Sequence, residues 1–165
     1  MSAMRVAFAL AVVLLIPAAA QARAADTLVI KVTSVSIAMQ THDKAPKGMP
    51  AKASKGDAIV FRDSLLNAAA QFGRKAGVKV GTDSGTMTYT SDHSAKFLGT
   101  AHLPGGTLTL KGQVLAASDG KSLVIPITGG TGRYKGAHGT VLVGPGAKRS
   151  LNTYALVLPA TGPVA

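Results

Sequence analysis

Two aspartates and a tyrosine lie where an alternating strand pattern turns their side chains toward an apolar interior. Asp63 shares the parity of Phe61 and Leu65 in one alternating run, and Asp83 shares the parity of Tyr89 in the next. A carboxyl group that leaves water without a partner is costly, and burial raises its pKa toward neutrality. Such a group can donate or accept a proton near neutral pH. We therefore expect Asp63 and Tyr89 to act in catalysis.

The same parity predicts that Asp83, Phe61 and Met87 line a pocket beside these residues. Simpler roles stay open for the polar side chains. Asp83 begins the turn-forming sequence Asp83-Ser84-Gly85, and Asp63 could accept hydrogen bonds from backbone amides at a rim. Tyr89 could be plain core packing.

Metal and phosphate sites are not indicated. The four histidines lack the spacing of metal ligands, and the chain has no cysteine or glutamate, so we expect no metal and no cofactor. The glycine-rich loop from Gly129 to Gly132 superficially suits phosphate binding. Gly136 and Gly139 argue against the helix that would complete such a site, so a tight turn is the expected use of this loop.

Eight alternating runs between turn signals are the elements that must position these side chains. We expect strands at Thr27–Met39, Asp57–Leu66, Val78–Thr90, Ala95–Leu103, Thr107–Leu115, Ser122–Thr128, Ala137–Val143 and Leu151–Leu158. Short turns between them favour antiparallel neighbours, and eight such strands can close without an exposed edge. The sequence therefore predicts an all-β, eight-stranded antiparallel barrel, with a two-sheet sandwich as the alternative.

Three local features qualify this pattern. The first strand changes phase, and a bulge near Thr33-Ser34 would account for the change. Residues Thr41–Lys55 are expected to form a long loop that either covers the barrel mouth or is simply solvated. Residues Ala68–Phe72 are expected to form one helical turn.

The first 24 residues have the features of an export signal. Arg5 precedes an apolar run from Val6 to Ile16, which Pro17 ends, and A-x-A patterns follow. The run is shorter than the roughly 20 residues that span a bilayer, although a permanent anchor is the alternative. We expect a signal peptide at residues 1–24, a single domain at 25–165, and a secreted or periplasmic mature protein.

The chain is strongly basic, with 18 lysines and arginines against 7 acidic residues and a formal net charge of +11. Such a surface attracts polyanions and anionic membranes without specifying one of them. Few aromatic residues accompany the basic ones, so we expect no nucleic-acid partner. The lysines of the Thr41–Lys55 loop leave contact with an anionic surface open.

Four segments resemble, in the same order, segments of plant dirigent proteins and allene oxide cyclases. The most distinctive runs from Ile125 to Gly139 and is similar to the dirigent signature lPVvGGTGkFrfArG and to the cyclase segment laVTGGSGiFeGAyG. The other three are Lys55–Leu65, Gly81–Ser91 and Gly106–Gly112. The resemblance spans about residues 55–158, which is nearly all of the expected barrel except its first strand.

This resemblance implies a barrel with an internal hydrophobic pocket, usually assembled as a trimer. Dirigents hold phenoxy radicals and the cyclases hold an allene oxide, so that one stereoisomer forms. By position, Asp63 matches a dirigent aspartate, Tyr89 matches a pocket tyrosine, and His138 replaces the arginine of the signature. We therefore add His138 to the candidate catalytic residues and Tyr134 to the pocket candidates.

This sequence lacks several of the polar pocket residues of both families, so the resemblance implies the fold more strongly than either reaction. The first-strand glutamate and pocket cysteine of the cyclases have no counterpart, and the first-strand aspartate of the dirigents is missing. We therefore expect an exported barrel that binds a small apolar or aromatic molecule and steers its cyclisation or coupling. The alternatives are a non-catalytic module that contacts an anionic surface or lipid through its basic loop, and a plain structural protein.

Overall fold

The computed structural model describes residues 25–49, 52–115, 122–146 and 148–160. The expected signal peptide at residues 1–24 lies outside the described residues, as does the expected Asp119-Gly120 turn. Within the described part of the chain, no helix combines the length and apolar character needed to cross a membrane. The eight strands are β1 (Asp26–His42), β2 (Ala58–Asn67), β3 (Lys79–Tyr89), β4 (Ser94–Leu103), β5 (Gly106–Leu115), β6 (Leu123–Gly130), β7 (His138–Val143) and β8 (Arg149–Leu158).

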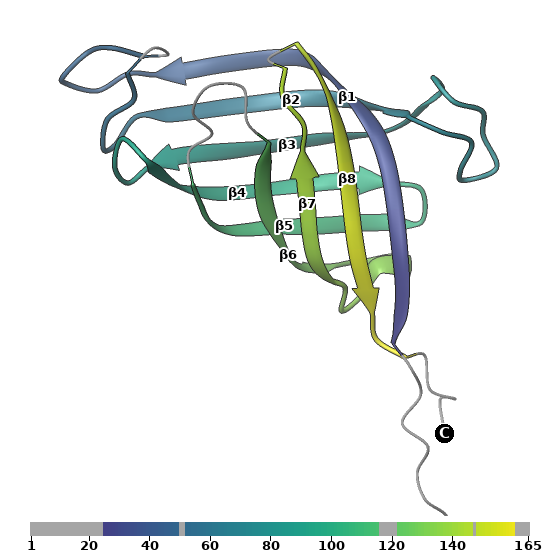
Figure 1. Cartoon of the computed structure of the whole chain (residues 1–165). Coiled ribbons are helices and arrows are strands. Elements are labelled where there is room, and N and C mark those ends of the chain that lie inside the picture. Colours follow the sequence, from purple (N-terminus) through teal and green to yellow (C-terminus); the bar gives the residue numbers. More distant parts are fainter. Residues whose placement is uncertain (1–24, 50–51, 116–121, 147, 161–165) are drawn as a thin grey trace, which may run out of the picture.

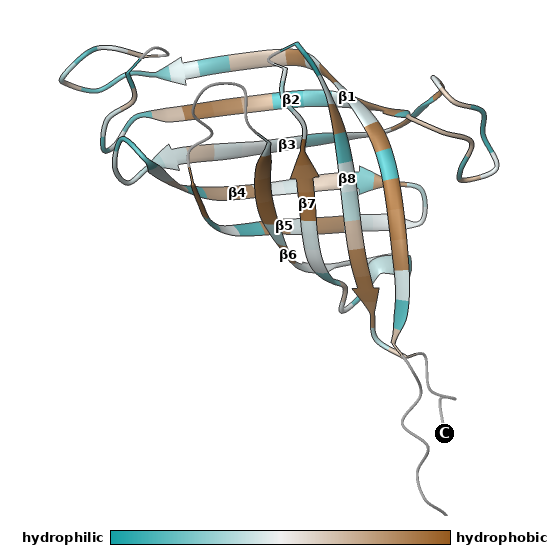
Figure 2. Ribbon diagram, viewed as in Figure 1, coloured by the Kyte–Doolittle hydropathy of each residue, from teal (hydrophilic) through white to brown (hydrophobic). Residues whose placement is uncertain are grey.

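The strands form one closed antiparallel barrel in sequence order (Figure 1). β1 completes the circle by pairing with β8 from Asp26 opposite Leu158 to Val35 opposite Arg149. All eight expected strands are present, and most of their ends are shifted by only one to three residues. Apolar and polar residues alternate along the strands, as is typical of strands with one buried face (Figure 2). The barrel is confirmed, and the two-sheet sandwich is wrong.

The phase change of β1 is real, but its place differs from the expectation. The register between β1 and β2 shifts between Ser36 and Ala38, and not at Thr33-Ser34. Ser34 and Ser36 therefore keep the inward parity of Val32. The small serines leave space inside the barrel at this height, where larger apolar side chains would fill it.

The expected helical turn at Ala68–Phe72 is wrong. This loop folds back on itself through a bridge between Gln71 and Arg74, and Phe72 adopts a positive φ of 55°. The buried side-chain amide of Asn67 donates hydrogen bonds to three backbone carbonyls of the loop, at Gln71, Arg74 and Lys75. These bonds hold the loop in a compact bend around the Asn67 side chain.

Antiparallel order places alternate connections at opposite ends of the barrel. The end that carries the β1–β2, β3–β4 and β7–β8 connections is called the mouth end below, and the opposite end is called the base. The expected Gly129–Gly132 turn lies at the base, where the short 3-10 helix η1 (Gly132–Tyr134) follows it. Gly139, at the start of β7, has a φ of +143°, and a Cβ there would lie 2.0 Å from the carbonyl oxygen of Ala155.

The base half of the barrel is filled by apolar side chains. The fully or almost fully buried residues of this packed base are Ile30, Val32, Leu65, Val80, Ala101, Leu103, Leu108, Ile127, Tyr134, Ala137 and Leu156. They come from every strand of the barrel or its adjoining turns, so the base holds all the strands together around one core. The mouth half has no comparable filling.

The β1–β2 loop is anchored at the mouth end by Asp57, whose side chain is fully buried. Its two carboxylate oxygens accept hydrogen bonds from the backbone amides of Lys44 and Ser54, both at 2.7 Å, and from the Ser54 hydroxyl at 3.1 Å. Burial alone would raise the pKa of Asp57, but these hydrogen bonds and the charge of Lys47 together lower it. The loop is therefore fastened by an ionised carboxylate, which the sequence expectation of a simple covering or solvated loop did not foresee.

Candidate functional site

A cavity of about 410 Å³ occupies the mouth half of the barrel. Its apolar lining consists of Met39, Ile59, Phe61, Met87, Phe97, Leu110, Leu123, Ile125, Val141 and Val143. The turn Gly144-Pro145-Gly146 between β7 and β8 forms part of its edge. A volume of this size suits a small organic molecule and is found among natural ligand pockets.

The polar lining is confined to one side of the cavity. It consists of Ser36 on β1, Asp63 on β2, Asp83 on β3, and Ser150, Asn152 and Tyr154 on β8. These four strands are neighbours in the closed barrel, while β4 to β7 contribute only apolar side chains to the lining. A bound molecule therefore meets a polar wall on one side and an apolar wall on the other.

Asp63 and Asp83 are register partners on adjacent strands and share one face of the sheet. The hydroxyl of the buried Ser34 donates a hydrogen bond of 2.7 Å to Oδ2 of Asp63. Asp83 is more deeply placed, with only 6% of its surface exposed, and its Oδ1 has no hydrogen-bond partner among the described residues. The two carboxyl groups thus differ in their partners, although they lie side by side.

Burial raises the pKa of the Asp83 carboxyl to about 7, and the adjacent charge of Asp63 adds to the increase. The Tyr154 hydroxyl lowers this pKa through hydrogen bonding, but by less. Asp83 is therefore able to give up or take a proton near neutral pH, which is the property required of a general acid or base.

Tyr154 reaches Asp83 across the interior, because β8 and β3 are separated in the barrel by β1 and β2. Its side chain is almost fully buried, and burial together with the nearby Asp83 charge raises its pKa well above the ordinary value. The phenol therefore stays protonated and acts as a donor. With Asn152, which receives a 2.9 Å hydrogen bond from Ser150, it closes the inner end of the cavity.

Residues 33–153 match the family described as the allene oxide cyclase barrel like domain, which covers most of the chain. The chain belongs to this family. The polar wall and the apolar wall described above are thus the lining of an allene oxide cyclase-like barrel.

Solved structures with the same fold include several enzymes. A pyocyanin demethylase is 23% identical, with a TM-score of 0.62, over 78% of this chain and 99% of that one. The Diels–Alderase AbmU from Streptomyces koyangensis is 22% identical, with a TM-score of 0.62, over 84% of this chain and 70% of that one. A pterocarpan synthase dirigent protein is 16% identical, with a TM-score of 0.60, over 86% of this chain and 99% of that one. At these identities the likeness shows the shared fold, and a search of curated proteins finds no match.

Four of the residues singled out from the sequence line the cavity of this allene oxide cyclase-like barrel. Asp63, Asp83, Phe61 and Met87 all point into it, as their parity predicts. Asp83 lies within β3 and caps no turn, so the simpler role left open for it is wrong. The catalytic role of Asp63 stays a prediction.

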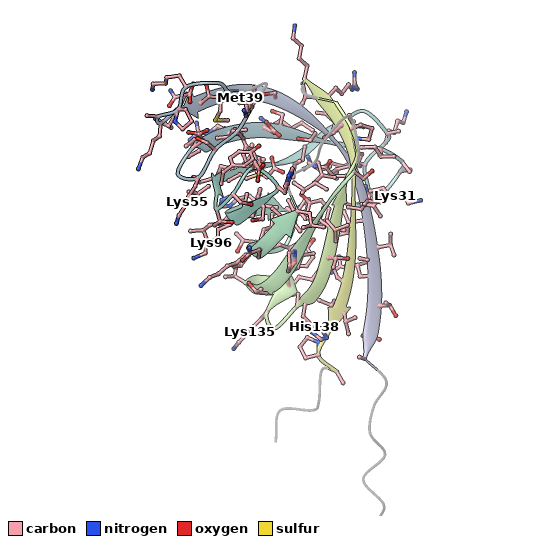
Figure 3. All side chains as sticks on the ribbon, turned by 60° about the vertical axis from the view of Figure 1, so that its left-hand side comes forward. Lys31, Met39, Lys55, Lys96, Lys135 and His138 are labelled. Atoms are coloured by element: carbon pink, nitrogen blue, oxygen red, sulfur yellow. The ribbon has the colours of Figure 1, made fainter. Side chains whose placement is uncertain are left out.

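The other three residues lie outside the cavity. Tyr89 ends β3 at the mouth end, where its backbone pairs with Gly56 and Asp57, and burial with the Asp57 charge raises its pKa. Tyr134 is buried in the packed base and donates a 3.0 Å hydrogen bond to the Pro104 carbonyl. His138 is exposed at the base, at the opposite end from Met39 (Figure 3).

Three functional side chains were not expected from the sequence. Tyr154, Asn152 and Ser34 build the inner end of the cavity or hold Asp63 there. The signal was present in the last strand, where Ser150, Asn152 and Tyr154 alternate at the parity of the buried Leu156. The parity argument that selected Asp63 and Asp83 would have selected these residues too.

Proposed function

We propose that this barrel binds a small apolar or aromatic molecule in its cavity and steers the cyclisation or coupling of that molecule. The carrying observation is a cavity in the mouth half whose inner end holds a carboxyl pair, of which Asp83 is buried and Asp63 is half-buried. A surface-binding module or a structural protein needs no such cavity. By contrast with the cavity, the outside of the barrel carries extended lysine side chains, among them Lys31, Lys55, Lys96 and Lys135 (Figure 3).

The proposed mechanism has two parts. The apolar wall of β4 to β7 holds the flexible part of the ligand in one conformation and excludes water, which favours one ring closure over others. The carboxyl group of Asp83 then gives or takes the proton that the reacting end requires, while Tyr154 donates a hydrogen bond beside it. The Ser34 hydroxyl holds Asp63 in place by a hydrogen bond, and Asp63 orients the same reacting end of the ligand.

The similar solved structures support this proposal. They include two Diels–Alderases, a cyclase that catalyses a [4 + 2] cycloaddition, and a pterocarpan synthase dirigent protein. These proteins perform ring-forming or coupling chemistry on one barrel scaffold. Export of the mature chain and its assembly as a trimer stay predictions.

Ligand binding is tested with the neutral apolar dye N-phenyl-1-naphthylamine, whose fluorescence rises when it leaves water. The chain has no tryptophan, so the dye is read against a low background. We expect saturable binding that Val143→Trp abolishes, because Val143 lines the cavity. The matched control is Leu142→Trp, since Leu142 is the adjacent residue of β7 and is 45% exposed on the outer face. Equal dye binding by both variants would overturn the proposed cavity site.

Steering is tested on the natural ligand. Native mass spectrometry of protein purified from its source should recover an apolar compound that Val143→Trp no longer retains. The recovered compound is then allowed to cyclise with and without protein, and the product is analysed by chiral chromatography. A single enantiomer with protein supports steering, and a racemic product contradicts it.

A further inference from the structure

The carboxyl pair at the inner end of the cavity lacks a cation. Among the described residues that line the cavity there is no lysine, arginine or histidine. Asp63 receives one hydroxyl hydrogen bond, and Oδ1 of the buried Asp83 receives none from the described residues. Buried carboxylates are normally paired with a positive group, since an unpaired one is costly to keep out of water.

We infer that the cavity selects an apolar ring system that carries a positively charged nitrogen, which lies against Asp63 and Asp83. This inference rests on the proposed function and names the substrate class of the same site. The cation supplies a positive charge that the described residues do not place beside the pair. A carboxylate ligand would meet repulsion at the same point.

Two aromatic rings at the cavity wall suit the same ligand. Phe61 and Phe97 both line the cavity, and their ring centroids are 5.7 Å apart with a tilt of 40°. The face of an aromatic ring attracts a cation within about 6 Å of its centroid, and this attraction strengthens in a site that excludes water. A cationic ring system is thus favoured by carboxylates at the inner end and by two aromatic rings in the cavity wall.

The surroundings of Asp83 determine how such binding depends on pH. Asp63 from β2 and Tyr154 from β8 are the titratable groups that act on it, and its register partner on β4 is Ala101. Asp83 is ionised above about pH 7 and protonated below it, so a permanent cation should bind more tightly at high pH. The positive charge of the chain as a whole, a net +11, repels a cation and so weakens its binding.

The test uses three competitors that displace N-phenyl-1-naphthylamine from the cavity. They are the permanent cation N-methylquinolinium, the neutral 1-methylnaphthalene of nearly the same shape, and the anion 1-naphthoate. We expect N-methylquinolinium to bind about tenfold more tightly at about pH 8.5 than at about pH 5.5. The neutral competitor should show no such change, and the anion should be the weakest displacer at the higher pH.

Three variants assign the effect to the carboxyl pair. Asp83→Asn should remove the pH dependence, and Asp63→Asn should weaken cation binding at both pH values. Asp92→Asn makes the same change of charge outside the cavity, at a residue whose side chain is 63% exposed. This control should alter neither the pH dependence nor the strength of cation binding. Dye binding by each variant shows that its cavity is intact.

The outcomes separate the two proposals. If the dye binds in the cavity but the cation gains nothing at high pH, or keeps its gain in Asp83→Asn, the cation preference is overturned and the binding cavity stands. If the dye binds without regard to Val143→Trp, the proposed function itself fails.

Discussion

Asp63 on β2 and Asp83 on β3 face the same cavity as register partners, yet Oδ2 of Asp63 receives a hydrogen bond from Ser34, whereas Oδ1 of Asp83 receives none from the described residues. The charge of Asp63 opposes the ionisation of Asp83, but burial is the main cause of the raised pKa of Asp83, which is about 7. This asymmetry gives the inner end of the cavity a polar group whose charge changes near pH 7.

Replacing Asp83 with asparagine should make the protein more stable above pH 7. Folded Asp83 keeps its proton up to about pH 7, whereas the unfolded chain loses it near 3.8. Between these values the unfolded state binds fewer protons, so the free energy of unfolding falls as pH rises, by up to about 4 kcal/mol in total. Asp83→Asn removes this fall, which urea denaturation across the range measures.

The exposed Asp92→Asn variant is the control for this measurement. Its free energy of unfolding should follow that of the unchanged protein at every pH. Parallel curves for Asp83→Asn and the unchanged protein would show that Asp83 titrates normally in the folded state.

Replacing Tyr154 with phenylalanine should raise the pKa of Asp83 further. The hydroxyl of Tyr154 stabilises the ionised form of Asp83, and its removal leaves the raising effects of burial and Asp63 unopposed. A carboxyl-carbon NMR titration measures the midpoint. Tyr134→Phe is the matched control, because it removes a buried hydroxyl that bonds to Pro104 in the base, and it should leave the Asp83 midpoint unchanged.

Replacing Asp57 with asparagine should release the β1–β2 loop. The pKa of Asp57 is lowered in the folded state, so the stability it contributes is present above the unfolded value of 3.8 and is lost as pH falls through the folded value. The loop contains Lys44, Lys47, Lys52 and Lys55, which are trypsin sites. We expect cleavage there to become about tenfold faster in Asp57→Asn. An unchanged cleavage rate would show that other contacts hold the loop.

Replacing Gly139 with alanine should destabilise the barrel by about 2–4 kcal/mol. Its φ of +143° disfavours any side chain, and the added Cβ would lie 2.0 Å from the Ala155 carbonyl oxygen, where β7 pairs with β8. Gly129→Ala is the control, because a Cβ there meets nothing within 4 Å, and it should change stability by less than about 0.5 kcal/mol. Urea denaturation of both variants compares them directly.

The strands and the barrel could be predicted from the sequence because their signals are local. Alternation sets which side chains face inward, and glycine and proline turns set where each strand ends. The carboxyl pair was found in this way, since Asp63 and Asp83 each sit at an inward parity of their own strand.

Parity tells which way a side chain points, but it does not tell its height along the barrel axis. Tyr89 lies at the very end of β3, where its backbone pairs with Gly56 and Asp57, and His138 lies at the base, so neither lines the cavity. Height depends on the tilt and stagger of the closed barrel, which are set by pairing between distant segments. For the same reason the contact of Tyr154 with Asp83, 71 positions apart in the chain, could not be read from either strand alone.

The division of the barrel into a packed base and a mouth half with a cavity has a consequence for the evolution of such proteins. The packed base contributes most to stability, whereas the fit to a bound molecule is decided by cavity residues outside the buried core, such as Met39, Ile59 and Val143. Substitutions of those cavity residues can change the shape of the cavity while the packed base keeps its packing. A single scaffold is thereby open to new guests without first having to be rebuilt.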